Sequence, residues 1–266
     1  IISAYKALIT FDPYPIIVNY SDTQNTKIFR RVTRYYWGIT GTVYLFDKQP
    51  ASVMLFYMAR IARVIAPGIP HHITQRGNRR QQTFFCDDDY QAYLELMAEW
   101  CAKFNVEIWA WCLMPNHVHL IAVPESEEGL ARAIGEAHRR YTRRINFREK
   151  WRGHLWQERF ASFPMDESYL LAATRYVEMN PVAAGIVALP QAYSWSSAKA
   201  HLLAQDDTLV KVAPLLPLVG NWDSFLSLTS EDEMTTFHKH ERSGRPLGNE
   251  TFVKQVENQL GRTLRL

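Results

Sequence analysis

The stretch VEIWAWCLMPNHVHLIAV (residues 106–123) contains two apolar runs separated by Pro115 and Asn116. Runs of this length are typical of strands, and proline and asparagine favour turns. The stretch therefore predicts an antiparallel hairpin. Because successive side chains of a strand point to opposite faces, His117 and His119 are expected on the same side of it.

The sequence on either side of the hairpin predicts the other strands of a small sheet and the helices that flank it. The last long helix is expected to stop before Pro181, since proline disfavours helical geometry in the residue before it. The order strand, helix, strand, strand, helix, strand, helix predicts an α+β fold, with a ferredoxin-like antiparallel sheet flanked by helices. The predicted strands cover residues 71–75, 106–114, 117–123 and 155–164, and the predicted helices cover 87–104, 127–150, 166–180 and 251–260.

Composition places the chain among soluble globular proteins. It has 266 residues, of which 47% are hydrophobic and 21% charged, enough for one domain with appendages or two small ones. The three cysteines, Cys86, Cys101 and Cys112, are too few for a disulfide framework and favour a reducing cytoplasm. Neither a membrane span nor a secretion signal is expected.

Charge is distributed unevenly along the chain, although the net charge is only +3. Residues 130–160 contain nine Lys or Arg against three acids, a net charge of +6. Residues 205–241 contain seven acids against two Lys, a net charge of −5. The basic segment favours a polyanion such as nucleic acid as partner, with a solvated helix face as the alternative.

Two imidazoles on one face of a strand can bind a single divalent ion. The alternative is a pair of polar residues on the solvated face of an amphipathic strand. A third ligand is expected near Tyr176 and Asn180, which lie one helical turn apart, with Pro181 placing the Asn180 amide at the helix end. Tyr141 has no such partner, because Ile145 follows it by four residues.

Several stretches together resemble a known family, the single-tyrosine HUH transposases, and in particular the bacterial REP-associated tyrosine transposases. The similarity begins near Met58 and extends to the C-terminus, and the motifs occur in the family's order. They are LMPNHVHLIAV (113–123), GHLWQERFASFPMDESYL (153–170), RYVEMNPVAAGIV (175–187) and, more weakly, GRPLGNETFV (244–253).

The resemblance implies roles for the motif residues. His117 and His119 correspond to the family's metal-binding histidines, Tyr176 to its nucleophile, and Asn180 to its third ligand. The ion implied is Mg²⁺ or Mn²⁺, although zinc also suits histidine. The reaction implied is cleavage and rejoining of single-stranded DNA through a 5′-phosphotyrosyl link, at a palindrome folded as a hairpin beside a tetranucleotide guide.

Basic and aromatic residues are the expected DNA contacts, because cations follow phosphates and aromatic rings stack on bases. An ordinary surface or core role is the alternative for each of them. The DNA-binding candidates are Arg76, Arg79, Arg80, Arg139, Arg140, Arg143, Arg144, Trp156 and Arg159.

The resemblance also divides the chain. Residues 58–204 are expected to form the HUH transposase domain, and residues 205–266 an acidic segment with a short helical tail. Residues 1–57 are expected to be an extension from read-through or a wrongly assigned start, with a small extra subdomain as the alternative. The resemblance implies a bacterial, nucleoid-associated cytoplasmic protein, either monomer or homodimer.

Two other functions compete with strand transfer. The first is a non-cleaving binder of repetitive palindromic DNA that acts as a regulator. The second is a metal-dependent hydrolase of small phosphoesters, which would use water as nucleophile and leave Tyr176 without a role.

Overall fold

The computed structural model describes residues 63–228 and 243–264, together with Phe237, His240 and two short N-terminal strands. The chain divides into two compact units, residues 1–62 and residues 63–266. In the first unit β1 (Ala7–Phe11) pairs with β2 (Tyr14–Val18) in antiparallel register. The expectation for residues 1–57 falls mostly outside the described residues and stays a prediction.

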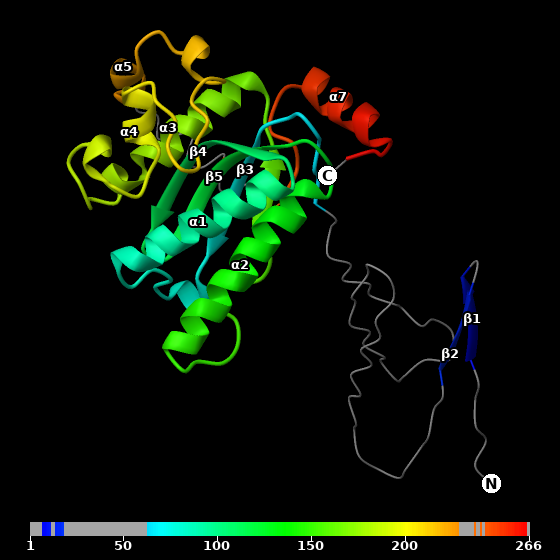
Figure 1. Ribbon diagram of the computed structural model, residues 1–266. Helices are drawn as coiled ribbons and strands as arrows, with labels where there is room; N and C mark the ends of the chain where they lie inside the picture. Colours follow the sequence, from blue (N-terminus) through cyan, green and yellow to red (C-terminus); the bar gives the residue numbers. More distant parts are fainter. Residues whose placement is uncertain are drawn as a thin grey trace. The chain divides into compact units, whose positions relative to one another are not determined.

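The second unit is built on a four-stranded antiparallel sheet (Figure 1). Its strands lie in the order β4-β5-β3-β6, so the first strand in sequence lies between the third and the fourth. With one helix in each crossover, this is the ferredoxin-like arrangement that the sequence predicts. The strands are β3 (His71–Arg76), β4 (Val106–Met114), β5 (His117–Pro124) and β6 (Ala161–Pro164).

The hairpin β4–β5 forms as predicted, with Pro115 and Asn116 in the turn. Backbone hydrogen bonds hold this turn against the chain that follows β3. The Thr83 N–H donates to the Pro115 carbonyl over 2.8 Å, and the Gly77 N–H donates to the Asn116 carbonyl over 2.8 Å. The end of β5 that carries the histidines is therefore fixed from two sides.

Helices cover both faces of the sheet. Helices α1 (Asp87–Lys103) and α2 (Gly129–Arg148) lie together on one face, and α3 (Glu167–Ala183) packs on the other (Figure 1). Strand β5 alternates between the two cores accordingly. Val118 and Leu120 enter the core under α1 and α2, whereas Ile121 joins the core under α3. The histidines of β5 thus face the α3 layer.

The strand predicted over residues 155–164 is shorter in the structure. Only Ala161–Pro164 form β6, while Trp156 makes an isolated bridge with Gly77. Glu158 has a left-handed backbone, with φ of +57°, and this conformation interrupts a strand.

The prediction that α3 stops before Pro181 is wrong. The helix continues to Ala183, with the Ala184 N–H donating to the Asn180 carbonyl over 3.0 Å. A proline here removes the bond that its own N–H would donate and crowds the carbonyl four residues before it. The Pro181 ring is buried, so packing holds the last turn in spite of this cost. Asn180 therefore lies within the last turn.

The remaining elements complete the α3 side and the C-terminal end. None of the helices in the described part of the chain is both long and apolar enough to cross a membrane. Helix α7 confirms the predicted terminal helix. The α-helices are α4 (Ala198–Leu202), α5 (Trp222–Leu226) and α7 (Glu250–Leu260), and the 3-10 helices are η1 (Asn78–Arg80), η2 (Pro190–Ala192) and η3 (Leu216–Leu218).

Candidate active site

The two histidines of β5 lie side by side on the α3 face of the sheet. Their ring centroids are 4.9 Å apart and the rings are nearly perpendicular, at 83°. His119 is buried and His117 half-buried, so the pair extends from the core to the end of the strand. His117 also lies within 2.6 Å of the Asn116 side-chain oxygen through its Nδ1.

A third histidine, His72, joins the pair from β3. In the β3–β5 register Thr74 lies opposite His119 and His72 opposite Ile121, so His72 occupies the same face. Its Nε2 lies 3.2 Å from the His119 Nδ1, and the two rings are parallel within 8°. Sequence reasoning missed His72. Its place as the second residue of the strand HHITQR shows which strand residues share its face. Only the register between β3 and β5 shows that this face meets His119.

Helix α3 brings Tyr176 onto these imidazoles. The Tyr176 ring meets the His119 ring edge to face, with centroids 5.2 Å apart, and the His72 ring at 6.0 Å. The ring of Phe237 lies 5.5 Å from that of Tyr176 on another side. The structure thus brings together His117, His119 and Tyr176 from two separate elements.

Tyr141, the competing tyrosine, is a core residue. Its side chain is fully buried, and its hydroxyl donates a hydrogen bond of 2.7 Å to the Thr83 carbonyl. Burial and the nearby Asp89 carboxylate raise the pKa of Tyr141 further above its usual range. The neighbouring arginines therefore do not make it a nucleophile.

Asn180 follows Tyr176 by one helical turn, on the same side of α3. Its side chain is half-buried, and its backbone is helical, which differs from the helix-end geometry expected from the sequence. Asn180 stays a predicted third ligand.

The candidate metal ligands suit a cation that takes only a few of its ligands from the protein. Asn116 donates from its Nδ2 to the Arg80 carbonyl over 3.3 Å, so its oxygen faces His117 and accepts from the Nδ1 proton there. This tautomer puts the His117 lone pair on Nε2, the nitrogen that would bind a metal. Within the described part of the chain, no three His, Cys, Asp or Glu side chains form a metal-binding group. Water and phosphate oxygens would complete the coordination.

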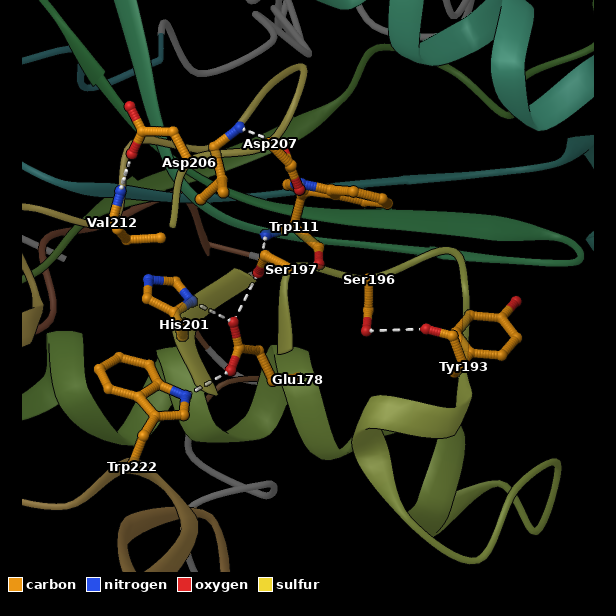
Figure 2. Close-up of polar contacts among 11 residues, drawn as sticks. Trp111, Glu178, Tyr193, Ser196, Ser197, His201, Asp206, Asp207, Val212 and Trp222 are labelled. Atoms are coloured by element: carbon orange, nitrogen blue, oxygen red, sulfur yellow. Dashed lines mark hydrogen bonds and ion pairs between the residues drawn. The ribbon is translucent and has the colours of Figure 1, made fainter. Parts of the chain in front are cut away.

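A buried polar cluster holds the opposite side of α3 (Figure 2). Glu178 is fully buried, and one of its oxygens accepts hydrogen bonds of 2.6 Å from the Ser197 hydroxyl and the His201 Nδ1. Its other oxygen accepts from the Trp222 indole N–H over 2.8 Å. Glu178 lies two residues after Tyr176, roughly 200° around the helix. The cluster therefore fixes the rotation of α3 that points Tyr176 at the histidines.

The predicted DNA-binding residues fall in two places. Arg76 lies opposite His117 in the β3–β5 register, on the face of the catalytic candidates. Arg79 and Arg80 follow it, exposed in η1. The arginines of α2 lie on the other layer of the molecule, away from Tyr176. They are Arg139 and Arg140, both ion-paired with Glu136, and the exposed Arg143 and Arg144.

Trp156 does not offer a ring to bases in this structure. It is 7% exposed, and its indole stacks on His138 with ring centroids 4.7 Å apart. This side chain packs in the core under α1 and α2, which corrects the expectation from the sequence. Arg159 is exposed, as a DNA contact requires.

Comparison with known proteins finds a matching family model. Residues 67–180 match the family model described as "Transposase IS200 like". This part of the chain is therefore similar to the IS200-like transposases. The IS200-like region contains every candidate site residue, from Arg76 to Asn180.

Individual proteins are similar to parts of this chain. A Haemophilus influenzae protein named as a REP-associated tyrosine transposase is 28% identical over 121 residues, which cover 40% of this chain and 69% of that protein. A solved REP-associated tyrosine transposase bound to a REP hairpin is 21% identical, with a TM-score of 0.48, over 58% of this chain and 92% of its own. A transposase structure from Deinococcus radiodurans is 18% identical, with a TM-score of 0.33, over 45% of this chain and 95% of its own.

Proposed function

We propose that the IS200-like domain is a metal-dependent single-stranded DNA endonuclease and strand transferase that uses Tyr176 as nucleophile. One observation carries the proposal: the Tyr176 ring lies against His119, with His117 beside it on the same face. The family match supports a transposase. A phosphoester hydrolase would leave this tyrosine without a role.

In the proposed reaction the Tyr176 oxygen attacks the scissile phosphorus. The new bond joins this oxygen to phosphorus, and the bond from phosphorus to the 3′ oxygen breaks. The Tyr176 hydroxyl gives up one proton and the leaving oxygen takes up one to become a free 3′-OH, so protons balance over the step. The DNA 5′ end stays linked to Tyr176. Attack by another 3′-OH reverses the step, so rejoining needs no ATP.

The chain's own residues hold and orient the reacting groups. His117, His119 and Asn180 would hold Mg²⁺ or Mn²⁺, and His72 orients the His119 ring. When bound, the ion polarises the scissile phosphate and stabilises the charge that develops there. Such help matters because a tyrosine with an ordinary pKa of about 10 is a poor nucleophile at neutral pH. Arg76 lies opposite His117 in the strand register and is a proposed phosphate contact.

The proposed substrate is a DNA palindrome folded as a hairpin. A solved relative is described as bound to a REP hairpin. A folded hairpin presents duplex phosphates to exposed arginines and unpaired bases beside its foot. Arg79, Arg80, Arg143, Arg144 and Arg159 are the proposed phosphate contacts.

Replacement of Tyr176 by Phe tests this proposal. Tyr176→Phe should form no covalent adduct with a hairpin oligonucleotide in Mg²⁺ or Mn²⁺, because only the hydroxyl is lost. Tyr141→Phe is the matched control; it should keep the adduct and lose about 1 kcal/mol of stability with its hydrogen bond to Thr83. Denaturing gels measure both. An adduct that persists in Tyr176→Phe and disappears in Tyr141→Phe would overturn the assignment.

A further inference from the structure

The C-terminal end of α2 and the loop that follows it form a shallow surface groove of about 700 Å³. We call it the α2 groove. It lies on the opposite layer from Tyr176. The proposed chemistry does not use it, although Arg143 in its lining is also one of the proposed phosphate contacts. Its charged and aromatic lining consists of Arg139, Arg143, Lys150, Arg152, Phe147 and Trp151.

Two aromatic side chains project from this groove into solvent. Phe147 is 87% exposed and Trp151 is 44% exposed. Among the large hydrophobic side chains of the described part of the chain, Phe147 is the most exposed. A ring this exposed contributes little to the core, and its face is open to a binding partner.

The loop is held in a fixed shape. The Asn146 side chain donates to the Gly153 carbonyl over 2.9 Å, and the Trp151 N–H donates to the Asn146 carbonyl over 2.9 Å. The Trp151 ring also meets the Phe85 ring edge to face, with centroids 5.7 Å apart. The Trp151 ring is therefore held in place before any ligand binds, which lowers the entropic cost of binding.

The groove is strongly cationic. Its lining has four basic side chains and no acidic one. Arg139 is paired with Glu136 over 2.6 Å, but no described carboxylate forms an ion pair with Arg143, Lys150 or Arg152. This charge pattern favours a polyanion over an apolar protein segment.

A short series of hydrogen bonds connects this end of α2 with the hairpin turn beside the histidines. The Tyr141 hydroxyl donates to the Thr83 carbonyl, and the Thr83 N–H donates to the Pro115 carbonyl. Arg80 accepts from the Asn116 side chain through its carbonyl. The groove and the turn that carries His117 therefore belong to one rigid end of the domain, with Arg79 and Arg80 exposed at the turn.

From these contacts we infer that the α2 groove binds an unpaired stretch of DNA, with its phosphates on the cations and its bases stacked on Phe147 and Trp151. The inference deepens the proposed function and rests on it for the choice of DNA as polyanion. A duplex hides its base faces and would use only the cations. Rings that stack on unpaired bases are the mark of single-strand recognition.

Binding of two labelled oligonucleotides to the full chain tests the inference. One is a blunt hairpin, and the other is the same hairpin with a single-stranded extension. The double variant Phe147→Ala with Trp151→Ala should bind the extended hairpin roughly tenfold more weakly and the blunt hairpin unchanged within about twofold. The matched control is Leu189→Ala with Leu203→Ala, two exposed side chains outside the groove, at 56% and 61%. It should bind both DNAs as the wild type does.

Equal binding of the extended hairpin by the aromatic variant and the wild type would overturn the inference. So would an equal loss on both DNAs, which would indicate duplex contact. Adduct formation, measured in parallel, separates this inference from the proposed function. If the wild type forms no adduct but the aromatic variant alone loses the extended hairpin, the strand-transfer proposal fails and the groove stands. If the adduct forms and the aromatic variant binds normally, the groove fails alone.

Discussion

His119 shows how one hydrogen bond decides what a residue can bind. A neutral imidazole has one N–H and one lone pair. His119 presents its Nε2 lone pair to a cation only if its Nδ1 carries the proton, and the acceptor for that proton is the His72 Nε2, 3.2 Å away. His72 is therefore a positioning residue for a ligand.

Replacement of His72 by Phe removes this acceptor and keeps an aromatic ring in its place. Because loss of an outer partner typically costs 10- to 100-fold in metal affinity or activity, we expect adduct formation to need roughly that much more Mn²⁺. His117→Ala with His119→Ala is the reference; it should abolish the adduct and keep most hairpin binding, since binding rests on phosphate contacts elsewhere. A titration of adduct against Mn²⁺ measures this. An unchanged midpoint in His72→Phe would remove His72 from the site.

At the scale of single residues, the sequence predicts which side chains lie together when they belong to the same strand or helix. The spacing of His117 and His119 places them on one face, and Tyr176 and Asn180 follow the same logic on a helix. His72 was not predictable, because the register between two strands far apart in sequence depends on tertiary packing. The expectation that Trp156 offers its ring to DNA bases fails for a related reason. An aromatic ring in a basic segment packs in the core when its neighbours there are Tyr141 and Phe84.

Helix α3 carries polar side chains on two sides, and the two sides have different roles. One carries Tyr176 towards the histidines, and the other buries Glu178 under three donors, from Ser197, His201 and Trp222. A buried carboxylate is stable only when its oxygens are hydrogen-bonded. The helix therefore cannot rotate without leaving Glu178 unpaired. The extension of α3 past Pro181 illustrates the same point, since tertiary packing overrides a local stop signal.

The glutamate-centred cluster gives an element-scale prediction. Glu178→Gln should lower the free energy of unfolding by about 1–3 kcal/mol, because the amide has one acceptor oxygen for the three donors and its NH₂ must face at least one of them. Adduct formation should slow as α3 loses its fixed rotation. Trp222→Phe removes one of the three donors, so the double variant should cost less than the sum of the single ones. Urea unfolding with a single-turnover adduct assay measures both effects; additive costs would contradict the predicted clash.

For the whole molecule, the fold class follows from the order of elements. Helices separated by strands in this order have few arrangements, and the ferredoxin-like one buries both faces of the sheet. Which of the two helical layers holds the candidate active site was not predictable. The α1 and α2 layer is an aromatic core with Tyr93, Tyr141 and His138, whereas the α3 layer holds the imidazoles and Tyr176. Sequence alone does not state which side of a strand meets which helix.

Two buried histidines outside the active site make stability depend on pH. The His71 Nδ1 donates to the Ile69 carbonyl over 2.7 Å, its Nε2 accepts from the Ala66 N–H, and burial lowers its pKa to about 4. Burial, with a smaller effect from Arg63, lowers the pKa of His138 to about 3. Both values lie below the roughly 6.5 of an unfolded chain, so the unfolded state binds more protons below that pH.

The free energy of unfolding should therefore have its full value above about pH 6.5. It should fall as the pH drops towards 4, by up to about 1.4 kcal/mol per pH unit for each histidine. Urea unfolding at several values between pH 7.5 and pH 5 measures this slope while most carboxylates remain ionised. His138→Gln removes one titrating group and keeps an acceptor for the Tyr93 hydroxyl, which lies 2.8 Å from the His138 Nε2. The variant should lose about half of the slope. A stability that stays flat from pH 7.5 to pH 5, or a slope that the variant leaves unchanged, would show that these two histidines are protonated without cost in the folded protein.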